Sequence, residues 1–431
     1  MDAVVSAHPA LRATASRWCS SPSFLTAYSA LRPGGTPDDR RALAEPVAER
    51  VLLAGEATSA NHPGTMHGAW ASGTAAADRL VAAGAATVAV VGAGLAGLAA
   101  ARRLHDAGRS VVVLEATELL GGRAGVDRSI GVAVHPGAAW VHGEIGNPVA
   151  DTAARLGVPL HRWVGERRVV VAGLGVVDPA IVERVEVWRA EVERRLDAAA
   201  AAGADRALWP VLAEVLAALP LAPIERRVLT SLVRSSYENV TAAAVDDLSL
   251  RYRSEPYHLP GDDLLVGADL RRIVDDVAAG LDIRLATTVT AIAAVPGSPH
   301  RTVTTTQGDL QVDGVVVTVP IGALLAGTPT FDPPLPAATR AALEMLTPGA
   351  VVKVTATFAS AFWAPAPAVH VVDDAPGHVP AWVDVSAISG RPTLAGFATG
   401  PASYALESLD EAALRAHVDR CLAPAAAAAV V

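Results

Sequence analysis

The chain has 431 residues, which is long enough for two domains, and 51% of the residues are hydrophobic. Its formal net charge of −9 argues against a nucleic-acid-binding protein, because neutralising phosphates requires clustered basic side chains. The two cysteines, Cys19 and Cys421, provide neither a disulfide framework nor a metal-ligand spacing, so we expect no metal. The N-terminus lacks a basic-then-apolar leader pattern, and we expect a cytoplasmic protein.

The first predicted elements are a strand over residues 50–54, a helix over residues 67–83 and a strand over residues 87–91. We expect the two strands to be neighbours in one parallel sheet, joined by the helix as a βαβ crossover. Residues 81–101 carry no charge and are long enough to cross a bilayer. The glycines among them favour a buried strand and a helix start, so we expect no membrane association.

A glycine-rich turn with the GxGxxG pattern of dinucleotide-binding proteins follows the second strand. Gly92 permits the tight turn, Gly94 lets the backbone approach a pyrophosphate, and Gly97 lets the next helix pack closely on the strand. That helix, predicted over residues 95–107, presents its unpaired N–H groups to the phosphate.

The next predicted strand covers residues 110–114 and ends at Glu115. An acidic side chain at this distance from the glycine-rich turn accepts hydrogen bonds from ribose hydroxyls. Strand, helix, strand and terminal acid stand in register, and together they predict a dinucleotide site.

Further signatures favour FAD over NAD. The runs Gly121-Gly122-Arg123 and Gly137-Ala138-Ala139-Trp140 resemble segments that line the FAD in the flavin amine oxidase superfamily. Arg123 can neutralise a pyrophosphate with two hydrogen bonds, and glycines admit a planar ligand beside the backbone. A tryptophan of the hydrophobic core is the alternative for Trp140. The resemblance implies that FAD contacts Gly55, Glu56, Thr65, Met66, Ala69, Gly92, Ala93, Gly94, Leu95, Ala96, Gly97, Glu115, Ala116, Gly122, Arg123, Gly137, Ala138, Ala139, Trp140, Val289 and Trp363.

The signatures stand in an unusual order. Residues 53–73 resemble the segment that closes the chain in this superfamily, yet they precede the glycine-rich turn that normally opens it. A circular permutation, natural or engineered, is the simplest explanation. The fold class implied is the two-domain flavin amine oxidase fold, α/β and α+β, with a Rossmann-type FAD domain and a mixed-sheet and helical substrate domain.

The resemblance also implies the domain boundaries. The FAD-binding domain is expected at residues 17–145 and 246–345, with residues 17–83 as the permuted C-terminal segment. The substrate domain is expected at residues 1–16, 146–245 and 346–431. Amphipathic helices predicted between residues 178 and 240 would roof the substrate cavity.

Lys353 is the only lysine among the 35 Lys and Arg residues, and it lies in an otherwise apolar, alternating strand over residues 349–358. A lysine, unlike an arginine, loses its proton readily when it is buried. The resemblance implies that Lys353 holds a water against flavin N5. A strand lysine on a solvated face is the alternative.

Three further positions concern the substrate. Tyr28 and Thr65 fall where the superfamily places the pair that flanks the substrate amine, and Thr65 leaves half of the aromatic cage of monoamine oxidases. His142 resembles the active-site histidine of polyamine oxidases, the alternative being a loop histidine with a nearby hydrogen bond. Ala27 occupies the position of the flavin-linking cysteine of monoamine oxidases, so the FAD is expected to be non-covalent.

The resemblance implies an oxidase that moves a hydride from the carbon next to an amine nitrogen to flavin N5. The products are an imine, then a carbonyl or a cyclised compound, and hydrogen peroxide from O2. We expect a polyamine-like or secondary amine, with Glu144, Glu238 and Glu255 as candidate anchors for a second ammonium. The alternatives are an L-amino acid oxidase, a biosynthetic amine oxidase, a silent flavin-bearing scaffold and an NAD-dependent dehydrogenase. A homodimer is a possible assembly.

Overall fold

The computed structural model describes residues 8–428. A five-stranded parallel sheet with the strand order β11-β5-β4-β15-β3 carries the glycine-rich turn. Alternate residues of its apolar strands enter two different cores: Val88 and Val90 face one side, and Ala89 and Val91 face the other. The strands are β3 (Val51–Leu53), β4 (Thr87–Val91), β5 (Ser110–Leu114), β11 (Asp282–Arg284) and β15 (Gly314–Val317).

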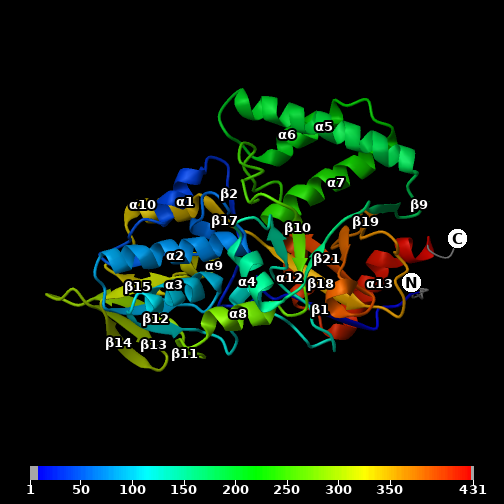
Figure 1. Ribbon diagram of the computed structural model, residues 1–431. Coiled ribbons are helices and arrows are strands. Elements are labelled where there is room, and N and C mark those ends of the chain that lie inside the picture. The colour runs from blue at the N-terminus through cyan, green and yellow to red at the C-terminus, as the bar shows by residue number, and fades with distance from the viewer. Residues whose placement is uncertain (1–7, 429–431) are drawn as a thin grey trace.

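Helices cover one face of this sheet, and a second sheet covers the other (Figure 1). On the helical face α2 packs along α3, α3 contacts α8, and α8 contacts α4. The opposite face packs on a four-stranded sheet, β14-β13-β12-β16, and on helices α1 and α10. These elements are α1 (Pro37–Leu43), α2 (Met66–Ala82), α3 (Leu95–Asp106), α4 (Pro148–Leu156), α8 (Leu270–Ala278), α10 (Ala337–Glu344), β12 (Val289–Ala294), β13 (Arg301–Thr305), β14 (Gly308–Val312) and β16 (Thr330–Asp332).

A seven-stranded mixed sheet has the order β1-β18-β21-β20-β19-β8-β9. Strand β18 is the predicted strand of Lys353, and it pairs antiparallel with β1 on one side and with β21 on the other. Helices α12 and α13 contribute to a core with the buried Trp363 and Trp382 of this region. The elements are β1 (Arg12–Ala15), β8 (Arg168–Val171), β9 (Gly175–Val176), β18 (Val351–Thr357), β19 (Ala368–Val372), β20 (Ala381–Asp384), β21 (Thr393–Thr399), α12 (Pro401–Glu407) and α13 (Glu411–Ala427).

The predicted helices between residues 178 and 240 are confirmed as α5 (Pro179–Ala201), α6 (Leu208–Ala217) and α7 (Pro223–Thr241). They share one apolar core, and α7 packs against β19 and β21 of the seven-stranded sheet. Figure 1 shows these green helices as a separate layer above that sheet. Helix α7 therefore lies against interior strands of this sheet, not against its edge strands β1 and β9.

Two small sheets join segments that are distant in sequence. One has the order β6-β10-β7, and the other pairs β2 with β17. Their strands are β2 (Ser29–Leu31), β6 (Trp140–His142), β7 (Leu160–Arg162), β10 (Asp263–Val266) and β17 (Leu346–Pro348). The remaining short helices are α9 (Ile321–Leu325), α11 (Ser386–Ser389), η1 (Glu56–Thr58) and η2 (Gly122–Ala124).

The expectation that the strands at residues 50–54 and 87–91 are neighbours is wrong. Both lie in the parallel sheet, but β15 lies between β3 and β4 and pairs with both. All four residues of β15 are buried, so an interior position with partners on both sides satisfies its backbone groups. The pattern of two strands and a helix could not reveal this partner, because it comes from residues near 314. No helix within residues 8–428 is long and apolar enough to cross a membrane.

Candidate active site

One large cavity of about 770 Å³ lies where the parallel sheet meets the seven-stranded sheet and α7. The C-terminal ends of neighbouring parallel strands contribute Val91, Glu115, Thr318 and Gly55 to its wall. Ligands of open parallel sheets bind at this edge, because the loops that follow the strands converge there. Lys353 and the polar residues of α7 line the other part of the cavity.

The glycine-rich turn is open at one position and tightly packed at another. Gly92 has φ +103°, which favours glycine, and no atom lies within 4 Å of the position that a Cβ of Gly94 would take. Gly94 lines the cavity, so its backbone is free for close approach by a ligand. Gly97 is not in the cavity wall: a Cβ there would lie 1.9 Å from the Gly92 carbonyl oxygen. It lets α3 pack closely on β4.

Glu115 follows β5 as a buried carboxylate in the cavity wall. Its Oε2 accepts a hydrogen bond of 2.7 Å from the Ala93 N–H, and its Oε1 accepts bonds of 2.9 and 2.7 Å from the Thr117 N–H and hydroxyl. A carboxylate oxygen can accept two hydrogen bonds, so Oε2 keeps capacity for a further donor. Ala93 does not line the cavity, and it contributes by fixing Glu115 to the turn.

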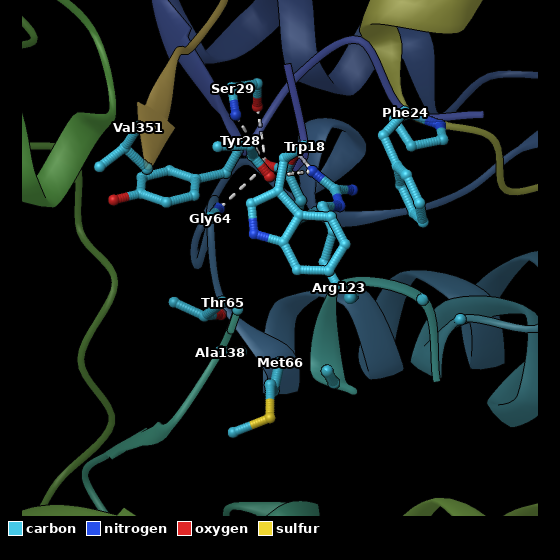
Figure 2. Close-up of a pocket in the computed structure, with 18 of the residues that line it drawn as sticks. Trp18, Phe24, Tyr28, Ser29, Gly64, Thr65, Met66, Arg123, Ala138 and Val351 are labelled. Atoms are coloured by element: carbon cyan, nitrogen blue, oxygen red, sulfur yellow. Dashed lines mark hydrogen bonds and ion pairs between the residues drawn. The ribbon is translucent and has the colours of Figure 1, made fainter. Parts of the chain in front are cut away.

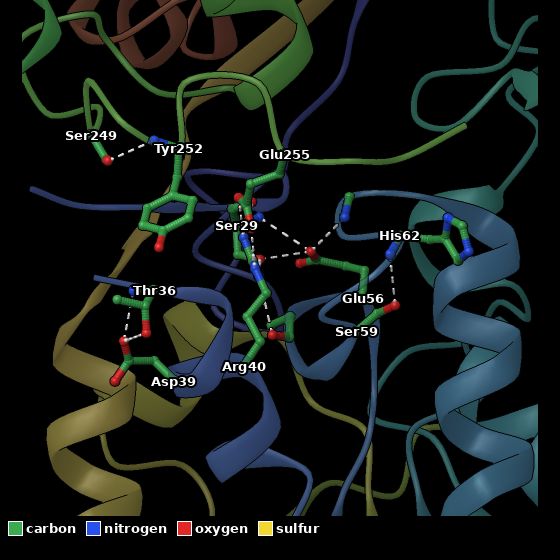
Figure 3. Close-up of polar contacts among 12 residues, drawn as sticks. Ser29, Thr36, Asp39, Arg40, Glu56, Ser59, His62, Ser249, Tyr252 and Glu255 are labelled. Carbon is green, nitrogen blue, oxygen red and sulfur yellow. Dashed lines mark hydrogen bonds and ion pairs between the residues drawn. The ribbon is translucent and has the colours of Figure 1, made fainter. Parts of the chain in front are cut away.

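A buried ion network connects the cavity to helix α1 (Figure 3). The fully buried Arg40 donates to both oxygens of Glu255, at 2.6 and 2.7 Å, and to the Ser29 hydroxyl at 2.8 Å. The same hydroxyl donates to Glu56 at 2.7 Å. Burial alone would raise the pKa of Glu56, but the guanidinium groups of Arg123 and Arg40 outweigh burial and hold it below the usual value.

Arg123 is held on the protein side of the cavity wall. Its Nη1 donates to the Ala27 carbonyl at 2.6 Å and to Glu56 at 3.1 Å. The contact of Arg123 with a pyrophosphate stays a prediction, and Glu56 already balances part of the charge of Arg123. Glycine at 137 is required by this arrangement, since a Cβ of Gly137 would lie 1.8 Å from the Arg123 carbonyl oxygen.

Trp140 lines the cavity and is half-buried. Its ring lies 6.3 Å from that of His142 in a stacked arrangement, and 5.8 Å from that of Trp163 in an edge-on arrangement. It also packs on a small apolar cluster that includes Ala139 and Leu265. Trp140 therefore combines the two alternatives: one part of its side chain lines the cavity, and another part packs on an apolar cluster.

Lys353 lies inside the cavity wall, not on a solvated face (the alternative weighed for it). Its Nζ donates to the carbonyl oxygens of His135, at 3.1 Å, and of Gly137. It also lies 5.4 Å from the centre of the Phe397 ring. Burial lowers the pKa of Lys353 to about 7, because no carboxylate offsets the loss of hydration.

Tyr28 and Thr65 both contribute to the wall shown in Figure 2. The Tyr28 hydroxyl donates to the Asn239 carbonyl of α7, and burial followed by the charge of Glu56 raises the pKa of Tyr28. The Thr65 hydroxyl accepts a 3.0 Å bond from the Gly68 N–H and caps the N-terminus of α2. Thr65 therefore has a structural task in addition to its place in the wall.

His142 lines the cavity and also has a partner on a neighbouring strand. Its Nδ1 lies 3.1 Å from Asp263 Oδ1, and the His258 Nδ1 lies 3.2 Å from the same oxygen. Burial raises the pKa of Asp263, but the hydrogen bond from His142 and the charges of the two histidines bring it below the usual value. The Tyr257 ring packs edge-on against His142 at 5.0 Å.

The structure contradicts the expected contact of Trp363 with the cofactor. Trp363 is fully buried, and its ring packs edge-on at 5.0 Å from Phe362 and 5.5 Å from Phe358, away from the cavity. Three aromatic rings in edge-to-face contact therefore pack in this core, and Trp363 has a structural role there. The expected positions that do line the cavity are Gly55, Glu56, Thr65, Met66, Ala69, Gly92, Gly94, Leu95, Ala96, Glu115, Ala116, Gly122, Arg123, Gly137, Ala138, Ala139, Trp140 and Val289.

The sequence patterns did not single out several residues of the site. Arg40, Asp263 and Tyr257 lie on segments without a recognisable motif, and only the fold brings them to the cavity or to its network. Asp263 opens a short strand and lies near His142 and His258, but only the fold shows this grouping, because His142 is distant from Asp263 in sequence.

Comparisons with known proteins agree with this geometry. Residues 1–81 and 95–429 match the family described as flavin containing amine oxidoreductase. Polyamine oxidase 2 of Arabidopsis thaliana is 30% identical over 352 residues, 76% of this chain and 70% of that protein. Lysine-specific histone demethylase 2 of Homo sapiens is 29% identical over 293 residues, 64% of this chain and 35% of that protein.

A solved structure supports the fold. Wild-type putrescine oxidase bound to putrescine superposes with a TM-score of 0.59 and 20% sequence identity, covering 78% of this chain and 81% of that one. At this identity the likeness concerns the fold alone. Because the family match spans nearly the whole sequence, the chain belongs to the flavin-containing amine oxidoreductase family.

Proposed function

We propose that the chain oxidises a polyamine-like or secondary amine with a non-covalently bound FAD, and that O2 is the electron acceptor. The single observation that carries the proposal is Lys353, a half-buried lysine with a pKa of about 7 in the same cavity as the glycine-rich turn. The 30% identity with a polyamine oxidase supports the substrate class.

The residues present fit the cofactor. Gly94 leaves open space for a phosphate beside the N-terminus of α3, and Glu115 keeps an acceptor site for a ribose hydroxyl. When bound, FAD supplies hydride acceptance and passes the electrons on to oxygen. A covalent link has no thiol available at Ala27, and the buried Cys19 does not line the cavity; burial first, then Glu407, raises the pKa of Cys19 to about 12.

Lys353 supplies a base with a pKa of about 7 in the wall of the cavity. Two of its donors are directed at the carbonyls of His135 and Gly137, which fixes Nζ in place. Above about pH 7 the amine is mostly neutral and has a lone pair that can accept a hydrogen bond from water. Lys353 can thus hold a water and exchange a proton with it, in keeping with the role that the family resemblance implies.

The glutamates considered as anchors for a second ammonium are already engaged. Glu255 pairs with Arg40, Glu238 pairs with Arg234 at 3.3 Å, and a Glu144 oxygen accepts from the Asp262 N–H. Of these three glutamates, only Glu255 lines the cavity. Asp263, held between two histidines, is the remaining carboxylate near the aromatic residues of the wall.

A screen for peroxide release tests the proposed reaction. The purified protein, with FAD, is incubated with primary, secondary and polyamine substrates in air, and peroxide is measured against the Lys353→Met variant. We expect at least one amine to yield peroxide with the parent protein and much less with the variant. Binding of FAD without peroxide from any amine would contradict an oxidase and favour the silent scaffold.

We also infer that the segment order is a circular permutation. The flavin signatures at residues 53–73 and at the glycine-rich turn line one cavity, although they stand in the reverse of the family's order. Within the described residues, β1 pairs with β18 and packs against α13, so the first and last described elements adjoin. Adjacent ends of the described residues make such a rearrangement physically tolerable.

A further inference from the structure

The cavity contains a cation without a partner. Among the cavity-lining arginines and lysine, Arg123 is bonded to Glu56, and Lys353 is bonded to two carbonyls. Arg167, which precedes β8, also lines the cavity, and within residues 8–428 no carboxylate or carbonyl accepts a hydrogen bond from its guanidinium. The nearest charges on α5 do not pair with it, since Glu186 is bonded to Arg189 at 3.2 Å.

The cavity's carboxylates, in contrast, are all engaged. Glu56 is paired with Arg123, and Glu255 with Arg40. Glu115 accepts from backbone and hydroxyl donors, and Asp263 lies between two histidines. Of the charged groups in the wall, Arg167 is therefore the one without a hydrogen-bonded protein partner within residues 8–428, and its guanidinium is available to a ligand of opposite charge.

The environment of Arg167 explains why its guanidinium is available to a ligand. Its side chain is exposed at the cavity surface, yet burial by the surrounding protein lowers the pKa of Arg167, which outweighs the opposing charge of Glu186. It lies close enough to His370 to help burial lower the pKa of that histidine to about 3. An exposed guanidinium without a protein partner keeps its N–H groups available to a ligand, and a carboxylate accepts two parallel hydrogen bonds from it.

We propose that Arg167 binds a carboxylate of the substrate, so that the substrate is an amine bearing an anionic group away from the reacting nitrogen. This inference rests on the proposed amine oxidation, and of the two proposed substrate classes it favours a secondary amine with an anionic group over a polyamine-like one. A diamine would place its second ammonium near Arg167, whose guanidinium is positively charged, and like charges repel. A carboxylate in the same place would have a favourable partner.

Three amines of equal chain length test the proposal, because they differ only at the far end: pentylamine, aminopentanoate with its carboxylate at that end, and diaminopentane. Shorter and longer versions of these three compounds, and their N-methyl derivatives, cover a range of distances between the reacting nitrogen and Arg167. Each compound is mixed anaerobically with the FAD-loaded protein, and the rate of flavin reduction is followed against concentration. We expect the carboxylated amine of the best length to react about tenfold or more faster per unit concentration than the other two.

Three variants distinguish a specific contact between Arg167 and the substrate carboxylate from a general effect of positive charge near the cavity. Arg167→Met keeps the apolar stem and should remove the preference for the carboxylate, so that the carboxylated amine reacts no faster than pentylamine in this variant. Arg167→Glu should favour the diamine instead. Arg194→Met is the matched control and should behave as the parent protein, because it removes an exposed charge of α5 while its partner Glu191 keeps the ion pair with Arg195.

Failure of this inference can be told apart from failure of the proposed function. If amines reduce the flavin but pentylamine or the diamine is preferred, or if Arg167→Met keeps the preference, Arg167 does not bind a carboxylate. If no amine reduces the flavin, the proposed oxidation fails, and pentanoate alone still tests Arg167 by its perturbation of the flavin spectrum. Equal pentanoate affinity in the parent and Arg167→Met proteins would overturn the inference.

Discussion

At the scale of single residues, the chemistry of the site depends on a few side chains that are buried with particular partners. Lys353 has two carbonyl partners and no carboxylate, and burial brings its pKa to about 7. Glu56 is buried, but two guanidinium groups keep its pKa low. The surroundings therefore bring the pKa of Lys353 close to 7 and keep Glu56 negatively charged. Of these two groups, only Lys353 can readily gain and lose a proton near neutral pH.

The pKa of Lys353 predicts how stability changes with pH. The unfolded chain binds the proton up to about pH 10.5 and the folded chain only up to about pH 7, so the free energy of unfolding rises between these values. Lys353→Met should lack this rise, which amounts to at most a few kcal/mol at about 1.4 kcal/mol per pKa unit. Denaturant unfolding of both FAD-free proteins near pH 6 and near pH 9 measures it. A parallel change in both proteins would place the pKa of Lys353 near its ordinary value.

Glu115→Ala tests the ribose contact. Removing the carboxylate deletes the acceptor for ribose and releases the Ala93 N–H, so FAD affinity should fall by about 1–3 kcal/mol. Titration of the FAD-free protein, followed by flavin fluorescence, gives the affinity. Glu118→Ala, an exposed neighbour, serves as the control. Equal affinities in the parent and Glu115→Ala proteins would show that Glu115 only holds the turn.

Some of these residues could be predicted from the sequence and others could not. Gly92, Gly94 and Glu115 belong to a local motif whose spacing fixes their geometry, and all three line the cavity. Lys353 was indicated by its uniqueness in an apolar strand. Arg167 carries no motif, and its missing partner becomes visible only when the whole cavity wall is assembled. The error at Trp363 has a similar origin, because a tryptophan after an apolar strand fits a core as well as a cofactor site.

At the scale of elements, the local sequence patterns predicted the bounds of helices and strands well, but they did not predict which strands pair in the sheet. The strand at Thr87–Val91 and the following strand at Ser110–Leu114 were predicted with the observed bounds. The helix between them ends one residue earlier than predicted, at Asp106. The partner of β3 was predicted wrongly, because β15 comes from a distant part of the chain and enters between β3 and β4. The proposed domain boundaries stay a prediction.

Gly97→Ala tests the contact between α3 and β4. The added methyl group would lie 1.9 Å from the Gly92 carbonyl oxygen, so α3 must shift away from the turn. Overpacking of this kind costs about 1–3 kcal/mol, and FAD affinity should fall along with the melting temperature. Gly203→Ala is the control, since no atom lies within 4 Å of its Cβ position and its φ is not positive. A variant that melts and binds FAD like the parent would show that the turn is less rigid than its packing indicates.

At the scale of the whole molecule, the inferred permutation predicts that segment order is not essential to the site. A chain that runs from Ala85 to Val431 and continues from Met1 to Gly84 restores the family's order. Both orders bury the same cores and differ mainly in loop-closure entropy, which changes slowly with loop length. The rearranged protein should therefore bind FAD and oxidise the same amine, with a modest change in stability. Loss of FAD in the rearranged protein alone would contradict the view that the two signatures are halves of one permuted site.

The central claim is that this cavity holds FAD and lets an amine reduce it. The most direct measurement is the visible spectrum of the purified, FAD-loaded protein under anaerobic conditions, before and after an amine from the screen is added. The account predicts an oxidised flavin spectrum that bleaches on addition of the amine and returns when air is admitted. It also predicts that acid or heat releases the flavin intact, in keeping with Ala27. A protein that binds no flavin, or a flavin that no amine in the screen bleaches, would contradict the account.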